Sequence, residues 1–91
     1  MLERKRLKEH SQVTFVLPAD APPGSVCVVG DFNDWQPGIH TLEPRADGMR
    51  AVSVALPDNS VHSFRYLASG DHWFDEDHAD DHDGTNNRVH T

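Results

Sequence analysis

The sequence predicts an all-β domain, an immunoglobulin-like antiparallel β-sandwich without a disulfide. Short runs of alternating apolar and polar residues recur along the chain, and clusters of Gly, Pro, Asn and Asp separate them at the spacing of about 8–12 residues that is typical of sandwiches. No segment has the length and periodicity of a crossover helix. The chain has one cysteine, Cys27, so it has no internal disulfide.

The expected elements follow from this alternation. Phe64, Tyr66 and Ala68 should face the core, with Arg65 and Leu67 on the other face of the same strand. The run SVCVVG is apolar on both faces, as in a strand inside a sheet, and we expect Cys27 there to be a small buried residue. We predict strands at residues 12–17, 25–30, 49–57, 62–70 and 87–91, a short segment at 39–42, and turns at 31–38, 47–48 and 57–60.

Length and charge limit the classes of function. A chain of 91 residues forms one domain with one thin core, too small for a barrel of about 250 residues or an enclosed two-lobed cleft. A net charge of −7 argues against a nucleic-acid partner. No apolar run approaches the ~18 residues of a membrane span, and MLERKRLKEH lacks the apolar core of a signal peptide. We therefore expect a cytoplasmic monomer that is not bound to a membrane.

The charges are unevenly distributed. Residues 1–11 form a basic N-terminal arm with at most a turn or two of helix, before a β-sandwich domain at 12–91. Residues 71–83 are rich in Asp, Glu and His. The arm is either a solvated tail or a segment that pairs with the acidic loop or with an anionic surface.

The stretch GDFNDWQPG, residues 30–38, combines turn-forming residues with Phe32 and Trp35. A solvated turn gains nothing by exposing an indole. Trp35 is therefore either a lid on the core or a surface for a ligand that packs on aromatic rings.

These residues carry a family resemblance. The series VCVVGDFNDW, Asp47-Gly48, Phe64-Arg65-Tyr66, WFD at 73–75 and GTNNRV at 84–89 is similar, in order, to the family-48 carbohydrate-binding modules. These are the early-set domains of isoamylases, pullulanases and branching enzymes, and the glycogen-binding domain of AMP-activated protein kinase β subunits. The resemblance covers nearly the whole chain, residues 12–90.

The resemblance implies non-catalytic binding of α-glucans such as glycogen or starch-like chains. Trp35 and Trp73 would form the sugar platform, Arg65 stands where the family usually has a lysine, and Asn86 or Asn87 would bind glucose hydroxyls. The chain departs from the family pattern at Met49-Arg50, in the stretched Gly70–Trp73 segment, at Asp75-Glu76 and at Asp83. The alternative is an early-set scaffold domain that docks an enzyme of glycogen metabolism and binds no sugar itself.

Sugar chemistry suits these residue types. An indole is a flat, rigid surface for the C–H face of a glucose ring, and amides and a guanidinium satisfy its hydroxyls. A shallow platform of this kind binds weakly, with a Kd of roughly 10 μM to 1 mM.

The acidic loop DHWFDEDHADDHDG leaves other sites to consider. The segment does not match a calcium loop of the EF-hand type, because the alignment places Ala79 at the first ligand position and His90 at the last. His72, His78 and His82 could bind a transition metal, but no spacing enforces it. Glycoside hydrolysis needs two carboxyls flanking a cleft, which a solvated loop does not supply. We expect no catalytic residue, metal or cofactor, and a mobile loop whose order depends on pH.

Overall fold

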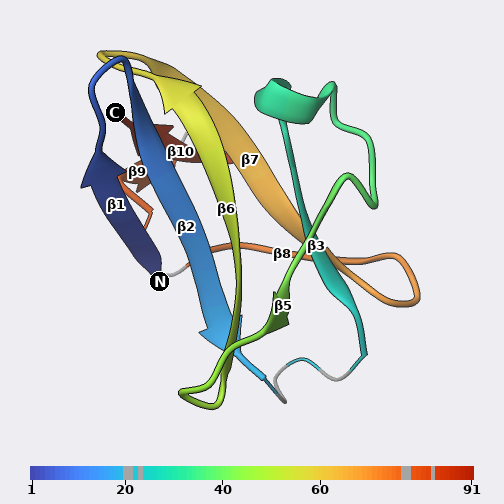
Figure 1. Ribbon diagram of the computed structural model, residues 1–91. Helices are drawn as coiled ribbons and strands as arrows, with labels where there is room; N and C mark the ends of the chain where they lie inside the picture. The colour runs from blue at the N-terminus through green and yellow to red at the C-terminus, as the bar shows by residue number, and fades with distance from the viewer. Residues whose placement is uncertain (20–21, 23, 77–78, 83) are drawn as a thin grey trace.

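The computed structural model describes residues 1–19, 22, 24–76, 79–82 and 84–91. In this part of the chain the strands form two antiparallel sheets (Figure 1). Sheet A has the order β1 (Leu2–Arg6), β2 (His10–Pro18), β6 (Met49–Pro57), β5 (Glu43–Pro44). Sheet B has the order β4 (His40–Thr41), β3 (Val26–Gly30), β7 (Val61–Ala68), β10 (Asn87–His90), β9 (Asp81–His82), and β8 (His72–Phe74) also pairs with β7. The predicted antiparallel β-sandwich without a disulfide is confirmed.

The core lies between the inner faces of the two sheets. Phe15 of sheet A packs edge-on against Phe64 of sheet B, with ring centroids 5.0 Å apart, and Tyr66 contacts both rings. The predicted inward positions are confirmed, because alternate residues of β2, β6 and β7 are buried together. The core cluster comprises Val13, Phe15, Leu17, Val26, Val28, Leu42, Val54, Leu56, Phe64, Tyr66, Ala68 and Val89.

The N-terminal segment contains a strand, β1, so the expectation of a turn or two of helix there is wrong. β1 pairs with β2 in the register Leu2↔Phe15 to Arg6↔Ser11, and Leu2 packs against the core. Arg4 forms an ion pair with Asp80, and the Met1 ammonium lies 2.6 Å from the Glu76 carboxylate. Of the two interpretations left open by the sequence, pairing with the acidic loop is the one observed.

Part of the acidic loop is also ordered against sheet B, which differs from the open, solvated loop expected. β8 and β9 form within it. Glu76 is buried and accepts a hydrogen bond of 2.7 Å from the Tyr66 hydroxyl. Burial, and then the negative charge of Glu76, raise the pKa of Tyr66. Residues 77, 78 and 83 of this loop lie outside the described residues. The dependence of the loop's order on pH stays a prediction.

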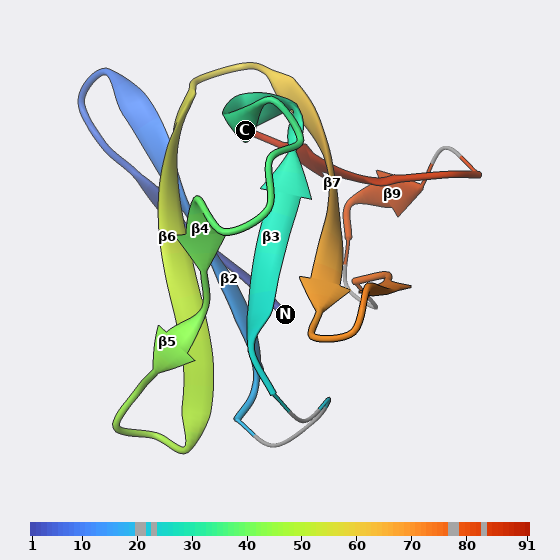
Figure 2. The same ribbon diagram turned by 90° about the vertical axis from the view of Figure 1, so that its right-hand side faces the viewer.

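Figure 2 shows β3, β4 and β7 of sheet B nearest the viewer, with the long strands β2 and β6 of sheet A behind them. A short 3-10 helix, η1 (Asp31–Asn33), follows β3, and the chain then descends to β4. The loop at 31–38 and the β7–β8 hairpin therefore both border the outer face of sheet B.

Candidate functional site

The outer face of sheet B carries a row of side chains set by strand register. Thr41 of β4 pairs with Cys27 of β3, Cys27 with Leu67 of β7, and Leu67 with Trp73 of β8. Directly opposed residues in antiparallel strands project from the same face. Because Tyr66 and Ala68 face the core, Leu67 and the whole row face outward.

Trp73 is 41% exposed at one end of this row, and Arg65 lies beside it. The Arg65 Cζ is 5.8 Å from the centroid of the Trp73 ring, a cation–π distance. The Asp75 carboxylate lies 3.4 Å from Arg65 Nε and, through its other oxygen, 3.4 Å from His82 Nε2. The guanidinium is therefore held between an indole and a carboxylate on the outer face.

The turn that carries Trp35 is held to the sandwich by the residues before it. A Cβ on Gly30 would lie 2.6 Å from the Ser63 carbonyl oxygen and from the Phe32 ring, so this position requires glycine. The Asn33 side chain accepts a hydrogen bond from the Gly30 N–H and donates one to the Val28 carbonyl, both 3.0 Å. The turn residues of GDFNDWQPG thus have a structural role, which is to fix the backbone beneath the indole.

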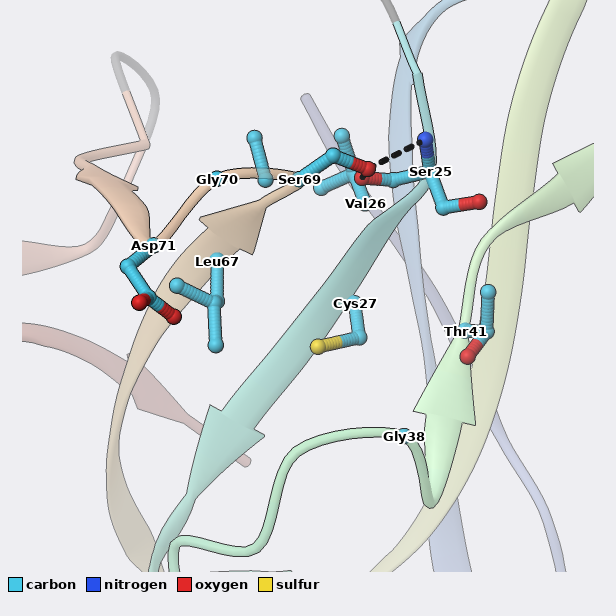
Figure 3. A pocket seen from close by; sticks show the side chains of 10 residues that line it. Ser25, Val26, Cys27, Gly38, Thr41, Leu67, Ser69, Gly70 and Asp71 are labelled. Atoms are coloured by element: carbon cyan, nitrogen blue, oxygen red, sulfur yellow. Dashed lines mark hydrogen bonds between the residues drawn. The ribbon is translucent and has the colours of Figure 1, made fainter.

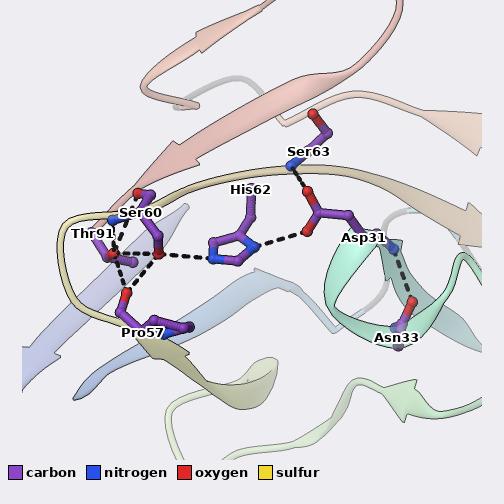
Figure 4. A network of polar contacts seen from close by, with 8 residues as sticks. Asp31, Asn33, Pro57, Ser60, His62, Ser63 and Thr91 are labelled. Atoms are coloured by element: carbon purple, nitrogen blue, oxygen red, sulfur yellow. Dashed lines mark hydrogen bonds and ion pairs between the residues drawn. The ribbon is translucent and has the colours of Figure 1, made fainter. Parts of the chain in front are cut away.

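A second set of contacts anchors the same turn to β7 (Figure 4). Asp31 accepts hydrogen bonds from the Ser63 N–H at 3.1 Å and from His62 Nδ1 at 2.8 Å. His62 Nε2 lies 2.8 Å from Ser60 Oγ, which also donates to the Pro57 carbonyl at 2.6 Å. The network therefore ties η1 to the β6–β7 turn.

The order Ser60–His62–Asp31 is that of a hydrolase triad, but its surroundings differ from those of a nucleophile. Ser60 Oγ is engaged by a carbonyl, and the Ser60 N–H donates to Thr91 Oγ1 at 3.0 Å. That backbone amide is therefore not available to stabilise an oxyanion. The contacts of this network support a structural rather than a catalytic role.

Trp35 is 40% exposed, so the indole is not buried as a lid. Asp34 and Trp35 both have left-handed backbone angles, with φ of 56° and 57°, and the Trp35 N–H donates to the Gly30 carbonyl at 2.9 Å. Gly30 pairs with Phe64, whereas Trp73 pairs with Leu67, three residues further along β7. The backbone at Gly30, to which the Trp35 N–H is hydrogen-bonded, is thus about 10 Å from that of Trp73 along the strand direction and two strand spacings from it across the sheet.

The two candidate asparagines have different environments. Asn87 is 0% exposed: its side-chain oxygen accepts from the Glu76 N–H and its amide donates to the Phe64 carbonyl, both at 3.2 Å. It therefore has no surface for a sugar, and its assignment as a binding residue is wrong. Asn86, one position earlier, is half-buried in the bend just before β10 and remains the candidate.

Sequence reasoning missed a hollow of about 280 Å³ on the same outer face (Figure 3). Cys27 is buried as predicted, but it lies between Leu67 and Thr41 on the outer face rather than in the core cluster. The alternation that turns Arg65 outward also turns Leu67 outward, which was the available signal. The lining residues are Ser25, Val26, Cys27, Gly38, Thr41, Leu67, Ala68, Ser69, Gly70 and Asp71.

Comparison of the sequence with protein-family models and with curated proteins found no match to either. Within the described residues, no cluster of three or more His, Cys, Asp or Glu side chains is placed to hold a metal ion. His78, part of the metal-site alternative, lies outside those residues, as does Asp83. Within the described ranges, no helix has both the length and the apolar character needed to span a membrane.

Proposed function

We propose that this chain is a non-catalytic α-glucan-binding module, as its resemblance to family-48 carbohydrate-binding modules implies. The observation that carries the proposal is the position of Trp73, half-exposed on the outer face of sheet B with the Arg65 guanidinium against its ring. An exposed indole beside a hydrogen-bond donor offers both kinds of contact that a pyranose needs. Trp35 and Asn86 are the supporting residues of the proposal.

The test is a chemical-shift titration of the two indole N–H signals with maltoheptaose, with cellohexaose as the β-linked control. We expect both signals to move with maltoheptaose alone, with a Kd of roughly 10 μM to 1 mM. Because the sequence contains exactly two tryptophans, each signal is assigned by one Trp→Phe variant.

No movement at several millimolar maltoheptaose would contradict the proposal and favour the scaffold alternative. That alternative, an early-set domain docking a glycogen-metabolising enzyme, would use a surface such as the basic edge strand β1. Its test is a pull-down with such an enzyme, comparing the wild type with a Lys5→Glu, Arg6→Glu variant.

A further inference from the structure

We propose that the outer-face hollow is an additional sugar subsite, which takes one pyranose unit of the α-glucan chain that packs on Trp73. This inference rests on the proposed function. It assigns a role to Cys27, Leu67 and Thr41, which the sequence motifs did not include.

The hollow lies between the two segments that carry tryptophans. Gly38, the last residue of the 31–38 turn, lines it on one side, and Gly70 and Asp71 of the β7–β8 hairpin line it on the other. Leu67 forms part of the hollow and is directly paired with Trp73. A chain stacked on the Trp73 indole and running across the sheet toward β4 therefore passes over the hollow.

The lining chemistry suits a sugar ring. Figure 3 shows the Cys27 thiol and the Leu67 side chain side by side, with the Asp71 carboxylate and the Thr41 hydroxyl on opposite sides of them. Apolar surface with a few hydrogen-bonding groups at its margin is the usual composition of small-ligand sites. The apolar side chains can take the C–H face of the ring, and the carboxylate and hydroxyl can bond its edge.

Size and position limit the occupant. A hollow of about 280 Å³ lies just below the range of roughly 300–1,000 Å³ for small-molecule sites, so it suits one ring rather than an oligosaccharide. Ser25 and Ser69 close one end: the Ser25 N–H donates to Ser69 Oγ at 3.1 Å, and the Ser69 N–H donates to the Ser25 carbonyl at 3.0 Å. The ligand chain then enters and leaves along the sheet surface.

Cys27 provides a direct readout, because it is the only thiol in the sequence and is 8% exposed at the hollow. The rate of its reaction with a small disulfide reagent is measured with and without maltoheptaose. At a maltoheptaose concentration of five times Kd, we expect the rate to fall to about one-sixth, the fraction of protein left unbound. Cellohexaose should leave the rate unchanged.

A pair of variants tests the site independently. Thr41→Phe places a ring over the hollow from the exposed edge strand β4, and Ala55→Phe places the same ring on an exposed position of β6. We expect Thr41→Phe to weaken maltoheptaose binding at least fivefold and Ala55→Phe to change it less than twofold. Thermal unfolding of both variants checks that they fold.

The outcomes separate the two proposals. Suppose that the Trp73 indole signal moves with maltoheptaose, that maltoheptaose leaves the rate of Cys27 modification unchanged, and that Thr41→Phe binds maltoheptaose as tightly as the wild type. In that case the hollow is not a subsite and α-glucan binding stands. Protection of Cys27 without an affinity loss in Thr41→Phe also overturns the subsite, because the protection then arises elsewhere. If neither indole moves, both proposals are wrong.

Discussion

Arg65 and Trp73 meet on the outer face of sheet B, with the guanidinium carbon 5.8 Å from the centroid of the indole ring. They belong to different strands, β7 and β8, and are brought together by the pairing of Leu67 with Trp73. The contact fixes the ring of a half-exposed tryptophan and orients a fork of N–H donors next to it. Preorganisation of this kind lowers the entropy lost when a ligand binds.

Trp73→Ala and Trp35→Ala should each weaken maltoheptaose binding by at least tenfold, about 1.4 kcal/mol, because each removes a stacking surface. Isothermal titration calorimetry measures the affinity. Both indoles are about 40% exposed, so we expect the free energy of unfolding to change by no more than about 1 kcal/mol. A larger loss of stability with unchanged affinity would instead indicate that the indoles are structural.

Asp75→Asn tests whether Asp75 positions Arg65. The substitution keeps the shape of the side chain and removes the charge that lies 3.4 Å from Arg65 Nε. We expect a loss of affinity of about twofold to fivefold, smaller than the loss of about tenfold for Arg65→Ala, because the donors remain but are less well oriented. In the Arg65→Ala background, Asp75→Asn should have no further effect. Additive losses in the double variant would show that Asp75 acts independently.

Alanine substitutions of Asn86 and Asn87 should have opposite effects on sugar affinity and on the free energy of unfolding. Asn87→Ala leaves the Glu76 N–H and the Phe64 carbonyl without their buried partner, so we expect a loss of about 2–4 kcal/mol in the free energy of unfolding. Asn86→Ala should instead weaken sugar binding, with a stability change below about 1 kcal/mol. Urea unfolding and calorimetry distinguish the two. A stable Asn87→Ala variant with weakened binding would overturn the assignment.

Gly30→Ala tests the anchoring of the Trp35 turn. The added methyl group meets the Ser63 carbonyl oxygen at 2.6 Å, and we expect a cost of about 1–3 kcal/mol together with a shift of the Trp35 indole signal. Gly48→Ala is the control. Its φ of 80° is strained for alanine, but nothing lies within 4 Å, so it should cost about 1 kcal/mol and leave the Trp35 signal in place.

The β9–β10 pairing predicts a dependence of stability on pH. Hydrogen bonds from His90 and then Arg88 lower the pKa of Asp81 below its ordinary value of about 3.9. The ionised carboxylate therefore stabilises the fold above that value, and the contribution is lost as the pH falls through the lowered pKa. Asp81→Asn should be less stable than the wild type at pH 7, and the difference should be smaller at pH 3.

Thermal unfolding midpoints at the two pH values measure this effect. Glu9→Gln, on the exposed β1–β2 turn, is the control for loss of one acidic charge. A loss of stability in Asp81→Asn, relative to the wild type, that is as large at pH 3 as at pH 7 would contradict the proposed origin of the effect.

The local pattern of apolar, polar and turn residues was sufficient to predict most of the strands of the sandwich. The alternation in Phe64–Ala68 correctly predicted the inward and outward residues of β7, and the turn residues of 30–38 correctly marked the reversal after β3. β1 was missed because its charged residues carry little strand signal, and it forms only where the edge of β2 offers backbone groups and the core offers a place for Leu2. Glu76 resembles its acidic neighbours in sequence, and it is the tertiary contacts with the Tyr66 hydroxyl and the Met1 ammonium that distinguish it.

Side-chain period and turn chemistry are local properties, so the chain alone specifies an antiparallel sandwich, its main strands and the two tryptophans outside its predicted core. Register is not local. A shift of one residue exchanges the faces of a strand, and the position of Asn87 opposite Phe64 buries one of two adjacent, chemically identical asparagines. The same dependence on register places Cys27 beside Leu67, and Leu67 beside Trp73, on the face that borders the Trp35 turn.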